Sequence, residues 1–269
     1  MIAFPPCKIN LGLTILSKRE DGFHNLETIF YLVQWADILE IIPSTETIFS
    51  SSGIPIPDDG SDNLCLKAYK LLKCDFKIPP VKIHLHKIIP IGAGLGGGSS
   101  DAAYTLRLLN SIFRLSLSNN QLKQYAAKLG SDCSFFVEDH PMIGTGKGEI
   151  LEPIELSLKK YYLVLIKPPI HVSTKEAYSD IRSRQPKNKL REVIQLPMLE
   201  WKNLLKNDFE ESVFKKYPEI EKIKNKLYQE GAVYASMSGS GSSVFGLFEK
   251  PIQLRHKFPE IDYWAGALS

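Results

Sequence analysis

A glycine-rich run constrains the fold of this chain more than any other part of its sequence. Residues 92–98 contain five glycines, and an alternating apolar stretch, residues 81–86, precedes them. After the run, apolar residues recur at helical spacing, at Ala102, Ala103, Leu106, Leu109 and Phe113. Because glycine costs backbone entropy, it is kept where a chain turns tightly or approaches a ligand closely. The run therefore predicts a strand, a tight turn and a helix, with a ligand at the start of the helix.

The turn at residues 90–100 is suited to an anion. Backbone amides in a turn without side chains, together with the positive end of the helix dipole, attract phosphate. We expect Ser99 and Ser100 to cap the helix and to present hydroxyls to a phosphate or to its Mg²⁺. Helix capping alone is the simpler alternative for both serines. A flexible linker is disfavoured, because linkers rarely lead directly into a well-patterned helix.

Two common phosphate motifs do not describe this run. Gly92, Gly94 and Gly97 satisfy the G-x-G-x-x-G pattern, but a dinucleotide fold also needs an acidic residue about 20 positions later. Residues 102–131 contain no Asp or Glu. A Walker A loop must end in Gly-Lys-Ser/Thr, and neither this run nor residues 144–148 does so. The run indicates a third kind of phosphate-binding loop.

The remaining patterns predict an α+β fold. Apolar alternation predicts strands at residues 6–16, 26–33, 37–42, 81–86, 161–166, 232–237 and 243–248. Helical spacing and capping signals predict helices at residues 63–72 and 118–129, from residue 173 onward, and at 218–230, whereas residues 50–62 have the composition of a loop. We expect Gly130 and Gly231 to end their helices in the left-handed conformation. A weak boundary near Pro153 predicts two domains, residues 1–153 and 154–269.

Composition narrows the functional class. The 33 basic and 30 acidic residues are too balanced for a nucleic-acid-binding surface. The four cysteines form no C-x-x-C pair, which argues against a zinc site and a disulfide framework. No apolar run approaches the roughly 18 to 20 residues of a membrane span. We therefore expect a cytoplasmic protein, a monomer or weak homodimer, with no nucleic-acid or membrane partner.

Several separated segments follow one pattern in order and spacing, namely residues 6–11 with 21–24, then 90–103, 130–136 and 238–242. Over its whole length the chain resembles the GHMP kinases and, among them, the 4-diphosphocytidyl-2-C-methyl-D-erythritol kinases of non-mevalonate isoprenoid synthesis. The resemblance implies a two-lobed fold, with an N-terminal lobe like ribosomal protein S5, a C-terminal α/β lobe and the active site in the cleft between them. It also implies transfer of a phosphoryl group from ATP, with Mg²⁺, to the 2-hydroxyl of the methylerythritol moiety.

The resemblance assigns catalysis to two residues. It implies that Asp132 is the base or the group that orients the acceptor hydroxyl, and that Lys8 is the cation that keeps Asp132 ionised and stabilises charge on the transferred group. The simpler alternatives are a helix cap for Asp132 and a surface strand residue for Lys8. The pattern favours catalysis, because Lys8 faces away from the apolar side of its strand and Asp132 follows Gly130 at the end of a helix.

The same resemblance implies where ATP binds. Its phosphates would lie against Pro90, Ile91, Gly92, Ala93, Gly94, Leu95, Gly96, Gly97, Gly98, Ser99 and Ser100, and Ser100 would also be a ligand of Mg²⁺. Asn63 belongs to a segment that approaches the adenine, and Lys87 ends the strand that leads into the glycine run. The turn at residues 238–242 would support the glycine loop near the phosphates, although a plain hairpin connection is an equally simple alternative.

Substrate recognition is implied for five residues. Phe23 and Tyr178 would stack on the two faces of a cytosine while His24 binds its edge, since a base requires aromatic faces and polar groups together. The family has tyrosine where this chain has Phe23, so stacking remains but any hydroxyl contact is lost. Asn10 and Thr174 would contact the methylerythritol or diphosphate part, with ordinary strand and helix-start polar residues as the alternatives.

Two other functions stay open on the sequence alone. Another GHMP kinase, of the homoserine or mevalonate type, would not need residues 21–24 for cytosine. A non-catalytic nucleotide-binding protein would keep the glycine run but lose Lys8 or Asp132, and both are present. His84 and His86 share a strand face, yet no third ligand lies near them in the sequence, so we expect strand residues and no metal site.

Overall fold

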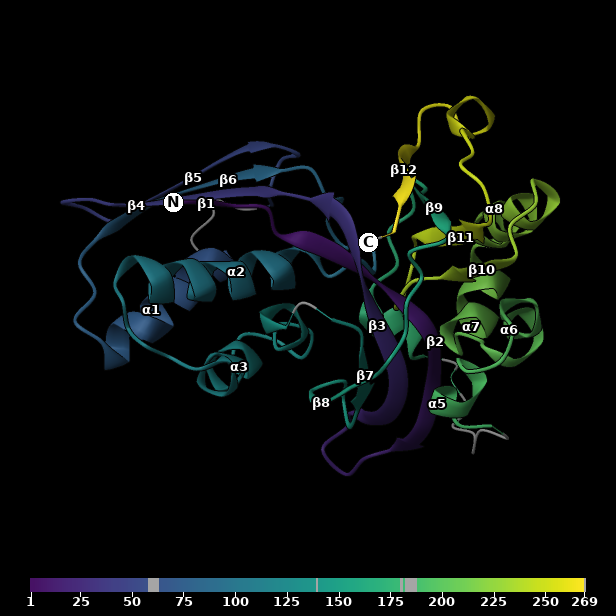
Figure 1. The fold of residues 1–269 in the computed structure, drawn as a ribbon, viewed down its shortest axis with the longest axis horizontal. Helices are drawn as coiled ribbons and strands as arrows, with labels where there is room; N and C mark the ends of the chain where they lie inside the picture. Colours follow the sequence, from purple (N-terminus) through teal and green to yellow (C-terminus); the bar gives the residue numbers. More distant parts are fainter. Residues whose placement is uncertain (58–62, 139, 180, 182–187, 269) are drawn as a thin grey trace. The chain divides into compact units, whose positions relative to one another are not determined.

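The computed structural model describes residues 1–57, 63–138, 140–179, 181 and 188–268, and it divides into two compact units (Figure 1). Unit 1 consists of Met1–Cys7, Trp35–Ile91 and Gly96–Asp139. Unit 2 consists of Lys8–Gln34, Gly92–Leu95 and His140–Ser269. The chain therefore passes between the units several times, and the glycine run contributes to both of them. The domain boundary near residue 153 stays a prediction.

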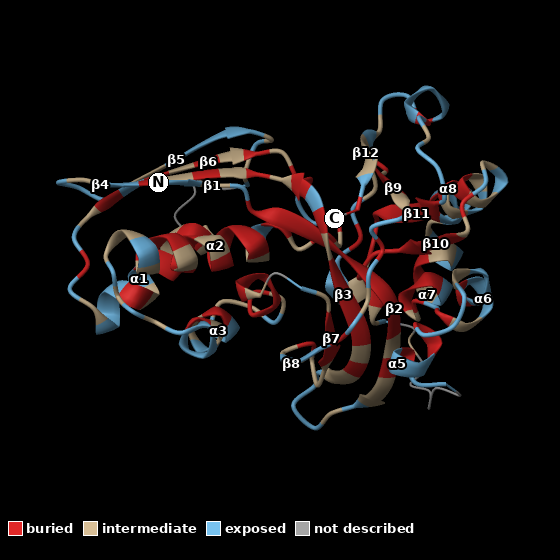
Figure 2. Ribbon diagram, in the orientation of Figure 1, coloured by how far each residue is buried: buried red, intermediate tan, exposed pale blue. Residues whose placement is uncertain are grey.

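Unit 1 is a four-stranded sheet with helices on one face. The strand order is β1 (Ile2–Ala3), β4 (Ile38–Pro43), β6 (Val81–Lys87) and β5 (Ile48–Gly53), and β5 runs parallel to β6 while the other pairs are antiparallel. The helices are α1 (Leu64–Asp75), α2 (Gly97–Ile112), α3 (Asn119–Ala127) and the 3₁₀ turn η1 (Phe135–Val137). Figure 2 shows that α2 is mostly buried. Alternation along β6 buries Val81, Ile83 and Leu85.

The prediction of a loop at residues 50–62 is wrong for residues 50–53, which belong to β5; residues 58–62 lie outside the described residues. β5 is an edge strand, and its three serines are exposed. There the Ser50 hydroxyl lies 2.8 Å from Nδ1 of His84, and the Ser52 hydroxyl lies 2.9 Å from Nδ1 of His86. Pairing with β6 satisfies the backbone, so short polar residues form a strand that their composition does not favour.

Unit 2 contains two further sheets. One has the order β2 (Pro6–Lys18), β3 (His24–Ala36), β7 (Met142–Thr145) and β8 (Ile150–Pro153), with the ends of β2 and β3 reaching into unit 1. The other has the order β10 (Tyr234–Met237), β11 (Val244–Phe248), β9 (Tyr162–Lys167) and β12 (Asp262–Ala267), and all its pairs are antiparallel. α8 (Pro218–Gln229) packs on β10 and β11, and its buried residues include Ile220 and Leu227.

Five shorter helical segments complete unit 2. They are α4 (Thr174–Ala177), α5 (Leu190–Val193), α6 (Met198–Leu204), α7 (Phe209–Lys216) and the 3₁₀ turn η2 (Arg255–Lys257). α4 begins at its predicted cap, since the Ser173 hydroxyl accepts a hydrogen bond from the amide of Glu176. No helix within the described ranges has the length and hydropathy that crossing a bilayer requires.

The predicted helix ends are half correct. α8 is followed by Gly231 at φ +97°, which confirms the left-handed residue expected there. α3 has the predicted capping box between Ser118 and Gln121 but ends at Ala127, and Gly130 does not have a positive φ. The backbone carbonyl of Gly130 instead accepts a hydrogen bond from the amide of Cys133, so Gly130 is the first residue of the next turn.

The first predicted strand is confirmed, but its polar face is not exposed. β2 is buried on both faces from Pro6 to Leu13, with only 3% of Lys8 and 2% of Asn10 exposed. The surface-residue alternative for Lys8 is therefore excluded. A buried ammonium and a buried amide require hydrogen-bond partners.

Candidate active site

The start of α2 in unit 1 differs from the prediction that serines cap it. The N-cap is Gly96, at φ +68°, and it makes no side-chain capping bond. Ser99 and Ser100 lie inside the first turns of the helix, so they are not its caps. A capping serine needs an extended backbone before the first turn, and a left-handed glycine occupies that position here. The helix thus begins with backbone amides at Gly97 and Gly98, as an anion cradle requires.

Ser100 has the chemistry expected of a weak metal ligand. Its side chain is buried, and its hydroxyl oxygen has no hydrogen-bond partner among the described residues. A hydroxyl without a protein partner has its donor and acceptor positions available to a ligand atom. The described residues include no group of three His, Cys, Asp or Glu side chains able to hold a metal. A single hydroxyl is compatible with Mg²⁺, which usually keeps several waters and binds phosphate oxygens besides one or two protein ligands.

Lys87 lies directly beneath the start of α2. A Cβ added to Gly97 would be 3.0 Å from the Lys87 ammonium. That ammonium donates to Asp37 at 2.5 Å and to Asp101 at 2.7 Å, and all three residues are buried. The other oxygen of Asp37 accepts the amides of Ile88 and Ile89. This buried triad ties the first turns of α2 to the end of β6 and the start of β4.

The charges of the triad perturb one another. Burial raises the pKa of Asp101 to about 7, although Lys87 opposes that change. Burial alone disfavours the Lys87 ammonium, but Asp101 and Asp37 outweigh it and raise its pKa. Lys87 thus stays protonated and holds the buried side chains of Asp37 and Asp101.

Asn63 is the N-cap of α1. Its side-chain oxygen accepts the amide of Cys65 at 2.8 Å and caps α1. The neighbouring Leu64 lies 3.8 Å from the position of a Cβ on Gly98, so α1 begins beside the start of α2. The predicted contacts of Asn63 and Lys87 with ATP stay predictions.

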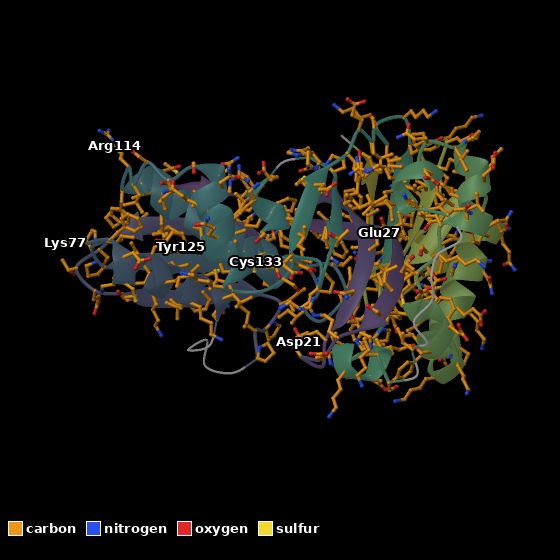
Figure 3. All side chains as sticks on the ribbon, turned by 90° about the horizontal axis from the view of Figure 1, so that it is seen from below. Asp21, Glu27, Lys77, Arg114, Tyr125 and Cys133 are labelled. Atoms are coloured by element: carbon orange, nitrogen blue, oxygen red, sulfur yellow. The ribbon has the colours of Figure 1, made fainter. Side chains whose placement is uncertain are left out.

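Asp132 lies in unit 1, in the turn that precedes η1. It is half-buried, and its backbone carbonyl accepts the amide of Phe135. The next residue, Cys133 (labelled in Figure 3), is buried, and its thiol is hydrogen-bonded to Ser99. Burial raises the pKa of that thiol to about 12, so Cys133 is inert at neutral pH. The thiol thus attaches the Asp132 turn to the first turns of α2, beside the cradle.

Lys8 lies in unit 2 with the other half of the glycine run. Its ammonium donates to the side-chain oxygen of Asn10 at 2.6 Å and to the carbonyl of Gly94 at 3.1 Å. The backbone amide of Lys8 donates to the carbonyl of Leu95. Asn10 donates in turn to Thr28 at 2.9 Å. Lys8 and Asn10, predicted as separate catalytic and substrate-binding residues, are therefore directly bonded.

The turn at residues 238–242 packs against Gly94 in unit 2. A Cβ at Gly94, which has φ +75°, would overlap the carbonyl oxygen of Ser238. The Ser238 hydroxyl donates to the Gly94 carbonyl at 2.8 Å. The ring of His171 lies beside Gly92, where a Cβ would be 3.0 Å from it. The turn is a hairpin connection between the antiparallel strands β10 and β11, and it also contacts the glycine run through Gly94.

Sequence reasoning missed Asn207 and Glu210. The Asn207 amide donates to the carbonyls of Met237 at 2.9 Å and Gly239 at 2.8 Å. Glu210 accepts the amide of Met237 at 2.9 Å. Both are buried polar residues near the start of α7. Residues 207–210 are mostly polar, so the sequence gives no local sign that Asn207 and Glu210 are buried, and their partners lie about 30 residues away along the chain.

The aromatic residues form a different pair from the one expected. The rings of His24 and Tyr178 are stacked at 4.7 Å with an interplanar angle of 18°. Phe23 is 58% exposed and lies under the Lys147 ammonium, 4.9 Å from it. Thr174 is the exposed first residue of α4. The structure thus brings His24 and Tyr178 together, and their contacts with a base stay predictions.

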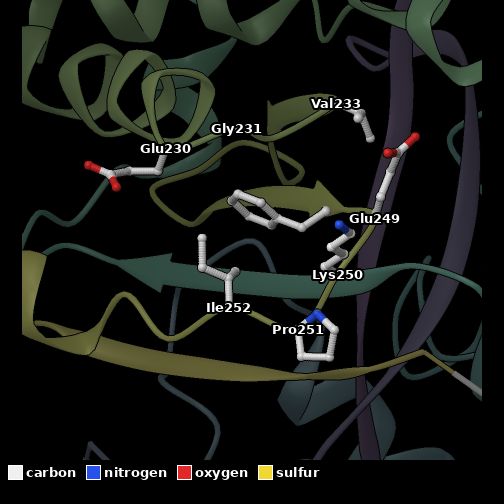
Figure 4. Close-up of a pocket in the computed structure, with 8 residues that line it drawn as sticks. Glu230, Gly231, Val233, Glu249, Lys250, Pro251 and Ile252 are labelled. Carbon is white, nitrogen blue, oxygen red and sulfur yellow. The ribbon is translucent and has the colours of Figure 1, made fainter.

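A pocket of about 250 Å³ in unit 2 lies elsewhere (Figure 4). It is lined by residues 230–231, 233 and 248–252, between the end of α8 and the segment after β11. None of the predicted site residues lines it. The pocket therefore does not contribute to the candidate active site.

Family comparisons agree with these features. The family described as GHMP kinases N terminal domain matches residues 63–142, and the one described as GHMP kinases C terminal matches residues 187–261. The fold is shared with a mevalonate kinase of Methanococcus jannaschii, at a TM-score of 0.71 and 15% identity, over 100% of this chain and 98% of the other. The fold and the glycine run thus define a GHMP kinase, an ATP-dependent phosphotransferase.

Proteins more similar to this chain identify its family within the GHMP kinases. A 4-diphosphocytidyl-2-C-methyl-D-erythritol kinase of Parabacteroides distasonis is 51% identical over 100% of both chains, and one of Azobacteroides pseudotrichonymphae is 55% identical over 93% of this chain and 94% of its own. A crystal structure of a 4-(cytidine 5'-diphospho)-2C-methyl-D-erythritol kinase superposes with a TM-score of 0.85 at 32% identity, over 100% of this chain and 99% of that one. The chain belongs to the 4-diphosphocytidyl-2-C-methyl-D-erythritol kinase family.

Proposed function

We propose that this protein transfers the γ-phosphoryl group of ATP to the 2-hydroxyl of 4-diphosphocytidyl-2-C-methyl-D-erythritol. The observation that carries the proposal is the buried ammonium of Lys8, which Asn10 and the carbonyl of Gly94 hold against the glycine run. A buried cation beside a phosphate-binding loop has a chemical use in phosphoryl transfer, where stabilising negative charge is the main task. A protein that only binds nucleotide has no need of it.

The reaction requires little covalent chemistry from the protein. The acceptor oxygen forms a bond to the γ-phosphorus while the bond from that phosphorus to the bridging oxygen of ADP breaks. We assign to Asp132 the proton that the hydroxyl releases, and to Lys8 the stabilisation of negative charge on the transferred group. The amides at the start of α2 hold the ATP phosphates.

Mg²⁺ is proposed as the partner of ATP. Ser100 is the residue of this chain that would hold it, through the hydroxyl that lacks any other partner in the described part of unit 1. When bound, Mg²⁺ neutralises charge on the phosphate oxygens. The remaining ligands would be phosphate oxygens and water, as is usual for this ion.

The acceptor can be tested directly. Purified protein is incubated with Mg·ATP and, separately, with the cytidylated methylerythritol, mevalonate or homoserine, and ADP release is measured. We expect ADP release only with the cytidylated compound. Release with mevalonate or homoserine and none with the cytidylated compound would exclude the proposed substrate and leave the GHMP kinase class intact.

We propose that neutral His24 binds the edge of cytosine beside the ring of Tyr178. Burial lowers the pKa of His24, and Lys18 lowers it further. The ring is therefore neutral at neutral pH and offers one nitrogen as an acceptor for the cytosine amino group. As the pH falls through this lowered pKa, protonation removes the acceptor.

The His24 assignment predicts a pH-dependent KM. In the wild type, the KM for the cytidylated substrate should be constant between pH 7 and 8 and rise several-fold by about pH 5.5. His24→Ala should have a raised KM at pH 7.5 that no longer depends on pH, with kcat little changed. His256→Ala, an exposed histidine in η2, is the matched control. An unchanged pH dependence in His24→Ala argues against the assignment.

The other expectations remain parts of the proposal. Phe23, Tyr178 and Thr174 are proposed to contact the cytidine and diphosphate parts of the substrate, and Asn63 and Lys87 to contribute to the ATP site. A cytoplasmic location, a monomer or weak homodimer, and the lack of a nucleic-acid partner stay predictions.

A further inference from the structure

The carbonyl of Gly94 has two donors. It accepts the Lys8 ammonium at 3.1 Å and the Ser238 hydroxyl at 2.8 Å. A carbonyl oxygen has two lone pairs, so both bonds can form at the same time. The position of this single oxygen therefore connects the proposed catalytic cation to the turn at residues 238–242.

Glycine residues allow the Gly94 carbonyl to reach both donors, but they also leave its orientation poorly fixed unless a further bond holds it. Gly94 has φ +75° and Gly239 has φ +54°, a backbone region that glycine enters at little cost. A Cβ on Gly239 would lie 3.2 Å from the Gly94 carbonyl and 3.4 Å from the side-chain oxygen of Asn10. The turn thus packs over both of these acceptors of Lys8. The peptide that joins Gly94 to Leu95 has several alternative orientations because Gly94 is conformationally free, so its carbonyl needs a bond that selects one of them.

Ser238 is itself fixed from both sides. Asn207 donates to the carbonyls of Met237 and Gly239, the residues that flank Ser238. Glu210 accepts the Met237 amide, and the Ser238 amide donates to Ser243 at 2.9 Å. Ser238, Asn207 and Glu210 are all buried. These bonds place the Ser238 hydroxyl independently of Lys8.

We propose that Ser238 is a positioning residue for Lys8: its hydroxyl fixes the Gly94 carbonyl, and that carbonyl holds the ammonium in place for phosphoryl transfer. The inference rests on the proposed catalytic role of Lys8. A lysine side chain has four rotatable bonds, and each acceptor of fixed position reduces the number of arrangements that it samples. A small displacement of a catalytic group is costly, because the transition state requires defined geometry.

Two serines of the same segment provide a matched comparison. Ser238→Ala removes the bond to Gly94, whereas Ser243→Ala removes a buried hydroxyl that has no hydrogen-bond partner in the described structure. We expect Ser238→Ala to lower kcat about tenfold, with KM values for ATP and acceptor within about threefold of wild type. Ser243→Ala should retain wild-type kcat. Equal kcat values in the two variants would overturn the inference.

A double-mutant cycle separates this inference from the proposed function. If Ser238 acts through Lys8, Ser238→Ala should lower kcat less than about twofold in a Lys8→Ala background. A further tenfold loss in that background would overturn the inference. If Lys8→Ala itself keeps wild-type kcat while folding normally, the proposed role of Lys8 is wrong. The kcat of Lys8→Ala thus tests the proposed function, and the effect of Ser238→Ala in that background tests the inference.

Folding is checked by circular dichroism and thermal unfolding before the kinetics. If Ser238→Ala does not fold, Ser238→Cys replaces it in the same cycle, since a thiol is a similar size and a weak donor. A loss of kcat that disappears in the Lys8→Ala background supports the inference for either variant. A loss that persists there overturns it.

Discussion

An Asp132→Asn variant is expected to lose roughly two to four orders of magnitude in kcat while folding and binding ATP as the wild type does. Asparagine has nearly the same shape, but it neither accepts the proton of the acceptor hydroxyl nor carries negative charge. The turn around Asp132 is held by backbone bonds, from Cys133 to Gly130 and from Phe135 to Asp132, and by the Cys133 thiol with Ser99. These bonds do not involve the carboxylate, and the side-chain oxygen of asparagine can still accept the Ser131 hydroxyl, so the loss should come mainly from chemistry.

Steady-state kinetics and calorimetry of ATP binding measure the two effects separately. The control is Asp75→Asn, the same chemical change at an exposed carboxylate of unit 1 that accepts the hydroxyl of Tyr125 at 2.6 Å. Its kcat should remain that of the wild type. If Asp132→Asn keeps kcat within about tenfold of wild type, general base catalysis by this residue is excluded.

The fold around the glycine run was predictable because its signals are local. Strand β6, the turn and α2 follow one another along the chain, and each has its own period or composition. The residue that caps the N-terminus of α2 was not predictable in the same way. Ser99 and Ser100 have the residue type of a cap, but the conformation of Gly96 decides where the helix begins. Sequence shows which residues permit a left-handed turn, and not which one adopts it.

The contacts of the site were less predictable, because their partners are distant in the sequence. The two-residue period of a strand puts Lys8 and Asn10 on the same face of β2, and they do bond. It did not reveal that this face is buried, nor that Gly94, 86 residues away, completes the cation site. The bond from Ser238 to Gly94 spans 144 residues. Local periodicity contains no information about such pairs.

Lys87 illustrates the same limit. Its position at the end of a strand before the glycine run predicted a residue of the ATP site, and it does lie beneath the start of α2. Its two carboxylate partners, Asp37 and Asp101, lie 50 and 14 residues away. A lysine near a phosphate loop is compatible both with a ligand contact and with an internal ion pair, and only the fold reveals the second.

The buried triad supports a large effect on stability. Lys87→Met is expected to destabilise the protein by about 3–5 kcal/mol, because it leaves two carboxylates buried without their cation. For a chain of this size that corresponds to a fall in Tm of roughly 6–20 °C. Differential scanning calorimetry measures it. Lys123→Met is the control in the same unit, since Lys123 and Glu138 form a partly exposed pair at 2.9 Å that should contribute at most about 1 kcal/mol.

Removing the carboxylate charges as well distinguishes charge from packing. With Lys87→Met, the changes Asp37→Asn and Asp101→Asn leave no buried charge, and the side-chain oxygen that remains at position 37 can still accept the amides of Ile88 and Ile89. This triple variant should recover at least about half of the lost stability, because neutral groups cost far less to bury than unpaired ions. Two results would show that the loss is not electrostatic. One is a Tm of Lys87→Met equal to that of Lys123→Met, and the other is a Tm of the triple variant no higher than that of Lys87→Met. The start of α2 would then owe its position to packing on Ile89, which lies 3.0 Å from a Cβ on Gly97.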